Sequence, residues 1–297
     1  MNQHYGELFA EMTSLSTDGI DSFSYFPNLL LVVLILGLLW VSKKAFDLFA
    51  FYSIEHQLVK EDNKAVTVGF VGYLGGVVAI LEGVLEGGSV SIVRSFVDVV
   101  VWGSIGIILL NLAGKINDVL ILKQFDNREE LINSKNVGVG IVVAGSYLAS
   151  AFIVRSVVMG ESLGWLLDIS LALFYFILAQ LTFYLYSVLY QVVTKFDFHK
   201  EIKEGNAAAG ISLGSNFIAM GILLSVPLQI SYSLFFYLVW FVVGACMLVF
   251  FRFVMDHVII PSERLDDEIH KDLNWGVALL EGCFSIAAVL VLQSVFS

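Results

Sequence analysis

Carboxylate residues in or beside long apolar runs are the first candidates for chemistry in this sequence. Four stand out, namely Glu82, Asp98, Asp168 and Glu281. A charged group in apolar surroundings is costly unless it is paired or faces water, so such residues mark ion pathways or interhelical partners. Asp98 and Asp168 each precede an asparagine by 38 residues. Because they lie near Arg94 and Arg155, they indicate either a charged mouth or an ion pair.

Three neutral polar residues lie at depth in similar runs: Asn111, Gln180 and Asn216. Together with the four carboxylates they form a candidate polar conduit for an ion or a small solute. The alternative for each residue is a hydrogen bond between helices, because polar side chains in lipid pair across helix contacts. The sequence leaves both interpretations open.

A repeated motif contains four asparagines: Asn63, Asn136, Asn206 and Asn274. They are 73, 70 and 68 residues apart, which indicates one helical hairpin per repeat. Asparagine is a strong N-cap, so we expect each one to begin a helix. The functional alternative is that the four amides converge on a vestibule and contact an ion or a partner.

Acidic residues precede every asparagine, and one from each repeat forms the candidate acidic ring: Glu55, Glu130, Glu201 and Glu268. Such a ring could concentrate cations. The alternative is a solvated surface whose carboxylates complement helix N-termini. His56 and His199 lie among these acids, but they lack the i, i+4 spacing of a helical zinc site, so we expect no metal.

Small residues follow every asparagine, and they include Gly72, Gly145, Gly214 and Gly282. Small side chains allow helices in lipid to approach closely. We therefore expect the even-numbered spans to be inner and closely packed, and the aromatic-rich odd-numbered spans to form a lipid-facing ring. A hinge or a narrow conduit is the alternative explanation for the glycines.

The composition sets the class of protein. The 297 residues are 58% hydrophobic and 14% charged, with a mean hydropathy of +0.85, which indicates a membrane protein. A net charge of -11 without clusters of Lys and Arg argues against nucleic acid as a partner. Cys246 and Cys283 fall in apolar runs, so we expect buried thiols rather than a disulfide.

Eight segments are long and apolar enough to span a bilayer as helices: roughly 26–50, 64–86, 92–118, 137–159, 163–193, 206–226, 231–256 and 275–296. The first 26 residues carry no Lys or Arg, whereas most Lys and Arg lie around 52–64, 120–136, 195–205 and 257–274. The positive-inside rule then predicts that these four loops are cytoplasmic and that both termini are outside.

The repeats also pair off. Asp118 and Asp256 each precede their asparagine by 18 residues, whereas His56 and His199 precede theirs by seven. The predicted fold is therefore an all-α integral membrane protein of two tandem four-helix halves. It comprises an external acidic segment 1–25, a first membrane domain 26–160 and a second membrane domain 161–297. Each repeat holds two spans, so all four repeats keep one orientation.

Tandem hairpins with an acidic loop, an asparagine and a Gly/Ala-rich helix resemble the YjfL-like bacterial inner-membrane proteins, domain-of-unknown-function family 350. One copy of that domain matches about half of the chain, so the resemblance covers residues 26–297 as two copies. It implies a multi-pass protein of the bacterial inner membrane and transfers no activity.

Two classes of function follow. The first is an ion channel or small-solute transporter of parallel hairpins in the lipid bilayer, formed by one chain or a homo-oligomer. The second is a structural or regulatory membrane protein that recruits a soluble cytoplasmic partner or responds to membrane stress. Phosphate-binding loops and hydrolase motifs do not occur, so we expect neither an enzyme nor a cofactor.

Overall fold

The computed structural model describes residues 22–87, 91–160 and 162–296, and in these ranges the secondary structure is entirely helical. Eight helices in this part are long and apolar enough to cross a membrane, which confirms the predicted all-α class. Their bounds are α2 Ser22–Ala50, α4 Lys64–Glu86, α5 Ile92–Ile116, α7 Val137–Met159, α8 Trp165–Val193, α10 Ala207–Ile230, α11 Leu234–Val254 and α13 Trp275–Phe296.

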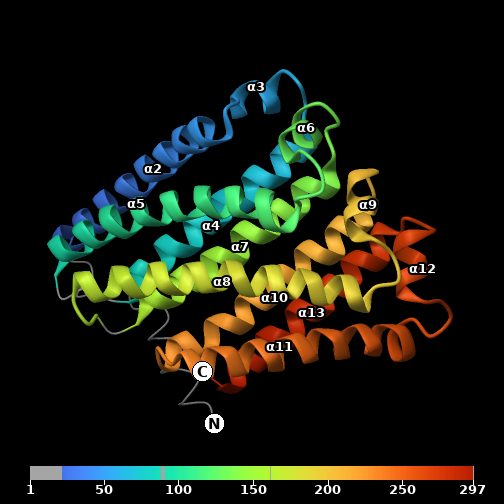
Figure 1. The fold of residues 1–297 in the computed structure, drawn as a ribbon. Coiled ribbons are helices and arrows are strands. Elements are labelled where there is room, and N and C mark those ends of the chain that lie inside the picture. Colours follow the sequence, from blue (N-terminus) through green and yellow to red (C-terminus); the bar gives the residue numbers. More distant parts are fainter. Residues whose placement is uncertain (1–21, 88–90, 161, 297) are drawn as a thin grey trace, which may run out of the picture.

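One short helix joins the two long helices of each pair. The short helices are α3 Ile54–Val59, α6 Asn127–Ile132, α9 Phe198–Lys203 and α12 Leu265–His270. All four lie at one end of the molecule, here called the short-helix end, which the charge distribution predicts to be cytoplasmic (Figure 1). The chain thus contains four units, each an outer helix, a short helix, an asparagine and an inner helix. Units 1 to 4 begin at α2, α5, α8 and α11.

The inner helices α4, α7, α10 and α13 pack side by side in that order, as an open row. The outer helices α5, α8 and α11 each pack more closely on the inner helix of the preceding unit than on their own. In the central helices α7 and α10, 78% and 83% of the span is buried, whereas in α13 only 28% is. The inner position expected for even-numbered spans therefore applies fully to the middle of the row only, because α13 is an end helix.

Small side chains allow the inner helices to touch backbone to backbone. A side chain at Gly72 would overlap Ala144, and one at Gly145 would overlap the backbone of Gly214. Likewise, Gly282 faces the Ser215 side chain. Glycine at these positions therefore serves close helix packing, as expected in lipid.

Short π-helical turns separate the units into two kinds. The turn η2 (Asn117–Ile121) ends the outer helix of unit 2, and η3 (Met255–Ile259) ends that of unit 4. Units 1 and 3 have no such turn in the described residues. The π-turns lengthen the chain before the short helix, which explains why the paired spacings from sequence separate units 2 and 4 from units 1 and 3.

Two expectations from sequence are wrong. Cys246 and Cys283 are both exposed on the outside of the helices rather than buried in the core. In a membrane protein an apolar run faces lipid as readily as protein, so hydrophobic neighbours do not indicate burial. In addition, α10 continues through Pro227 to Ile230 instead of ending near 226. A proline in the last turns removes only one donor from the helix.

The residue before each asparagine has a positive φ, which L side chains adopt at a cost. The angles are 45° for Asp62, 50° for Lys135, 89° for Gly205 and 51° for Leu273. Glycine adopts this conformation most readily, and only unit 3 has one.

We expect Leu273→Gly to stabilise the protein by about 0.5–1 kcal/mol, because it relieves this backbone cost. The matched change Gly205→Ala should destabilise it by a similar amount. Thermal unfolding of the purified protein in detergent measures both. Equal Tm values for Leu273→Gly and the wild type would contradict the expectation.

Candidate functional site

Three of the four asparagines join consecutive units in a series of hydrogen bonds, here called the asparagine ladder. Each Oδ1 accepts the N–H three residues later, at 3.1–3.3 Å, and so begins an inner helix. The Nδ2 group then donates to a backbone carbonyl in the next unit's short helix. These bonds are Asn63 to Leu131 at 2.8 Å, Asn136 to Ile202 at 2.7 Å and Asn206 to Ile269 at 2.8 Å. The asparagines thus cap helices and also connect units.

The acidic residues expected to form a ring instead hold the ladder. Asn136, Asn206 and Asn274 donate to Glu130, Glu201 and Glu268 at 3.1, 2.8 and 2.7 Å. Unit 1 uses Gln57 for this role, bonded to Asn63 at 2.9 Å, and Glu55 is exposed. Three of the four carboxylates proposed for a cation-attracting ring thus accept hydrogen bonds from the asparagines of their own units. A buried amide N–H must find an acceptor, and in three units this acceptor is a carboxylate.

A second fourfold feature holds the start of each short helix. An acceptor near the end of each outer helix takes a hydrogen bond from the first residue of the short helix that follows. The pairs are Asp47 with Ile54 N at 2.8 Å, Asp118 with Asn127 Nδ2 at 2.7 Å, Gln191 with Phe198 N at 3.1 Å and Asp256 with Leu265 N at 2.7 Å. The sequence singled out Asp118 and Asp256 by spacing, and their role is to fix the loop.

Three of the candidate conduit carboxylates lie away from the short-helix end and are already paired. Asp98 lies 3.0 Å from Arg94, and Asp168 accepts the Ser162 hydroxyl at 2.6 Å. Arg94, Asp98 and Asp168 line one cavity of about 190 Å³. Glu82 pairs with Arg155 at 3.2 Å. Asp98 thus has Arg94 as its partner, whereas Arg155 pairs with Glu82 and Asp168 bonds Ser162.

The three buried amides make hydrogen bonds between helices. Asn111 donates to the Tyr73 hydroxyl at 2.9 Å, and Gln180 donates to Ser150 at 2.9 Å. Asn216 accepts from Tyr186 at 3.0 Å. These residues belong to different helix pairs, so the structure does not bring the seven candidates together along one path.

Glu281 belongs to a buried ion network that sequence reasoning missed. Arg252, 7% exposed, donates to Glu281 and to Asp266, both at 2.6 Å. Ser212 also donates to Glu281, and the guanidinium lies over the Tyr190 ring at 5.5 Å. Arg252 lies in the last turn of α11, so from sequence it was counted among the loop charges. Its spacing of 29 residues from Glu281 carries no local signal.

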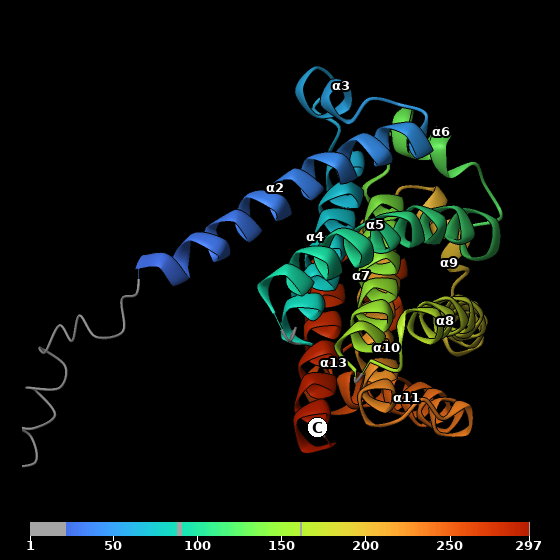
Figure 2. The ribbon, with the colours of Figure 1, turned by 90° about the vertical axis from the view of Figure 1, so that its left-hand side faces the viewer.

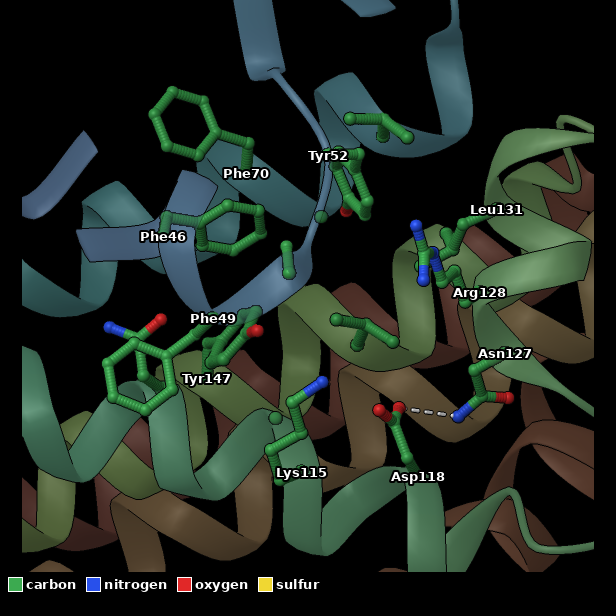
Figure 3. A pocket seen from close by; sticks show the side chains of 16 residues that line it. Phe46, Phe49, Tyr52, Phe70, Lys115, Asp118, Asn127, Arg128, Leu131 and Tyr147 are labelled. Carbon is green, nitrogen blue, oxygen red and sulfur yellow. Dashed lines mark hydrogen bonds between the residues drawn. The ribbon is translucent and has the colours of Figure 1, made fainter. Parts of the chain in front are cut away.

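The corresponding place in the first half is an open pocket at the short-helix end. Counted from Asn136 and Asn274, Gly114 and Val143 of unit 2 occupy the positions of Arg252 and Glu281. The pocket has a volume of about 70 Å³. Figure 3 shows the residues around it, and they include the aromatic side chains Phe46, Phe49, Tyr52, Phe70 and Tyr147 and the polar side chains Lys115, Asp118, Asn127 and Arg128.

The charged groups of this pocket come from two elements. Lys115 and Asp118 come from the end of the second outer helix, and Arg128 comes from α6, where it donates to the Phe51 carbonyl at 2.8 Å. Burial raises the pKa of the Tyr52 phenol above its usual range. The buried Asn127 Oδ1 has no hydrogen-bond partner within the described residues. The pocket therefore offers an apolar wall and both signs of charge.

His199 gives the short-helix end a pH dependence. Its Nε2 lies 2.8 Å from the Ile121 carbonyl of unit 2, and burial lowers the pKa of the imidazole. The folded protein thus favours neutral histidine.

When a folded-state pKa is depressed, the unfolded chain binds more protons, so stability falls as the pH drops below the unfolded value of about 6.5. We expect Tm to decrease between pH 7.5 and 5.5, and His199→Gln to reduce that decrease. His56→Gln, at the matched but exposed position of unit 1, is the control. An identical pH dependence in His199→Gln and the wild type would refute this assignment.

Breaking the ion network should be costly. Arg252→Met leaves the Glu281 charge buried without its main partner and should destabilise the protein by about 3–5 kcal/mol. The double variant Arg252→Met/Glu281→Leu should be more stable than Arg252→Met alone, because no uncompensated charge stays at position 281. A double-mutant cycle from unfolding in detergent measures this coupling. Additive effects would contradict it.

Comparison with known proteins agrees with this architecture. The family model described as "Domain of Unknown Function (DUF350)" matches twice, at residues 20–158 and 164–296. A UPF0719 transmembrane protein from Aquifex aeolicus (strain VF5) is 25% identical over 268 residues, which cover 87% of this chain and 97% of that protein. No solved structure matches. The two matches coincide with units 1–2 and 3–4, so the chain is a multi-pass membrane protein that belongs to the DUF350 family, with two tandem copies of the domain.

Proposed function

We propose that this protein is a structural or regulatory protein of the bacterial inner membrane that presents its short-helix end to a soluble partner. The observation that supports this most strongly is the backbone contact along the row of inner helices. A conduit needs space between helices, whereas here the helices that would line it touch.

The contacts recur along the length of the helices. A side chain at Gly140 would overlap the Ala65 carbonyl, and one at Gly221 would overlap the Ala149 backbone. Gly145 meets Gly214 between these two levels. The polar residues at depth are hydrogen-bonded in separate pairs. Both features favour a rigid scaffold over a single-chain pore.

The pocket of Figure 3 is the partner contact in this proposal. It opens at the short-helix end and combines aromatic walls with Lys115, Asp118 and Arg128. A side chain with an apolar body and a charged or amide tip, presented by a soluble protein, matches this lining. Phe51 lies beside it, 68% exposed, under the Lys115 ammonium at 5.3 Å.

A channel or transporter is the second candidate, and the buried network of Arg252, Glu281 and Asp266 favours it. Ionisable groups within a membrane span are costly and commonly serve ion or proton pathways. In this case several copies would form the conduit, because the inner helices of one chain touch one another and leave no space for it.

Two measurements on the full-length protein separate these functions. We expect liposomes containing it to pass ions and small solutes no faster than empty liposomes. We also expect a tagged chain in native membranes to capture a stoichiometric soluble partner. Lys115→Glu should lose that partner, whereas Lys123→Glu should keep it. Lys123 is the matched control because it also lies over an aromatic ring, Tyr184, but away from the pocket.

Flux above the empty-liposome level that disappears in Glu281→Gln would overturn the scaffold proposal and favour transport. If Lys115→Glu and Lys123→Glu captured the partner equally well, the pocket would not be the partner contact.

A further inference from the structure

The contact between neighbouring inner helices repeats with one register. The ninth residue after the asparagine of one unit meets the eighth residue after the asparagine of the next. The pairs are Gly72 with Ala144, Gly145 with Gly214 and Ser215 with Gly282. Three interfaces within one chain therefore follow the same rule.

In the last unit, the face of α13 that corresponds to the ninth-residue side of this interface is uncovered in the described structure. On α13, the residues two, six, nine and thirteen positions after Asn274 are Gly276, Leu280, Cys283 and Ala287, and all four are exposed. Asn274 caps its helix and bonds Glu268, and within the described residues no short helix of a following unit accepts the outward bond of the ladder.

In the first unit, α3 and α4 carry the residues that correspond to the eighth-residue side of the interface. The Leu58 carbonyl in α3 lies five residues before Asn63, as Leu131 and Ile269 lie before their asparagines. Thr67, Val71 and Val78 of α4 occupy the positions at which α7 meets α4, namely Gly140, Ala144 and Ala151.

The arrangement of the outer helices also leaves the two ends of the row uncovered in the described structure. The helices α5, α8 and α11 cover α4, α7 and α10, and none of the described outer helices covers α13 in the same way. Conversely, no inner helix precedes α2 among the described elements, and only 17% of its span is buried. Figure 2 shows α2 extending away from the other helices.

We propose that α4 and α2 of a second copy cover the exposed face of α13, so that unit 1 of one chain continues the row after unit 4 of another. Both copies then have one orientation in the bilayer, and Asn274 donates to the Leu58 carbonyl of the second copy. Such a head-to-tail contact is heterologous, so it generates a ring or an open row of chains. Val71 and Val78 are larger than the alanines they replace, so this contact is wider than those within the chain.

The native cysteines provide a direct test. By the register of the row, Cys283 faces Val71 of the second copy. The full-length variant Val71→Cys/Cys246→Ser should therefore form disulfide-linked dimers and larger species when native membranes are oxidised. The matched control is Val71→Cys/Cys283→Ser, which keeps the exposed Cys246 of α11 instead. It should remain monomeric on a non-reducing gel, because Cys246 lies on an outer helix. A disulfide requires Cβ atoms about 3.5–4.5 Å apart, so the cross-link reports register as well as proximity.

Equal cross-linking in both variants, or none in either, would overturn the proposal. A second measurement does not depend on the Val71 substitution. Native mass spectrometry of the wild type released from lipid nanodiscs should show more than one copy, and Ala287→Trp should reduce that number by blocking the face of α13. A wild type that is monomeric, with lipid alone on α13, would refute the head-to-tail contact. Neither result bears on partner capture through Lys115, so the two proposals fail separately.

Discussion

The fold depends on the need of a buried amide for hydrogen bonds on both of its ends. An asparagine Oδ1 is satisfied within its own inner helix, but the Nδ2 group has two protons and must find acceptors away from that helix turn. In this protein one acceptor belongs to the same unit and one to the next, as for Asn206 with Glu201 and Ile269. The cap therefore sets the distance between consecutive units, and small residues follow because helices held this closely leave no room for side chains.

The two halves use the same framework in different ways. Where the second half has Arg252 and Glu281, the first half has Gly114 and Val143 and an open pocket. An ion pair at that place holds α11 to α13, whereas in the first half Gly114 of α5 lies against the Tyr147 side chain of α7. Internal duplication thus produced one closed and one open version of a site, and the open version is the better candidate for recognition of another molecule.

Local and periodic signals predicted much of this structure. The spans, the four caps, the glycine contacts and the pairing of units follow from helix length, capping preference and a repeat period, all of which are properties of short segments. The sequence did not predict the inter-unit bond of Asn136 to Ile202, the burial of Glu201 or the Arg252 network. These depend on which units become neighbours, which no single segment determines. The exposure of Cys283 was missed because apolarity in a membrane protein does not distinguish lipid from core.

The open row also has a consequence for how the protein can lose structure and change in evolution. Among the described helices, those that pack closely belong to the same unit or to adjacent units, as in a solenoid laid within the bilayer. The stability of such an array is approximately a sum of unit and nearest-neighbour terms. Local unfolding should then start at the terminal units and stop at the central pair. In evolution, whole hairpins could be gained or lost without rebuilding a closed core.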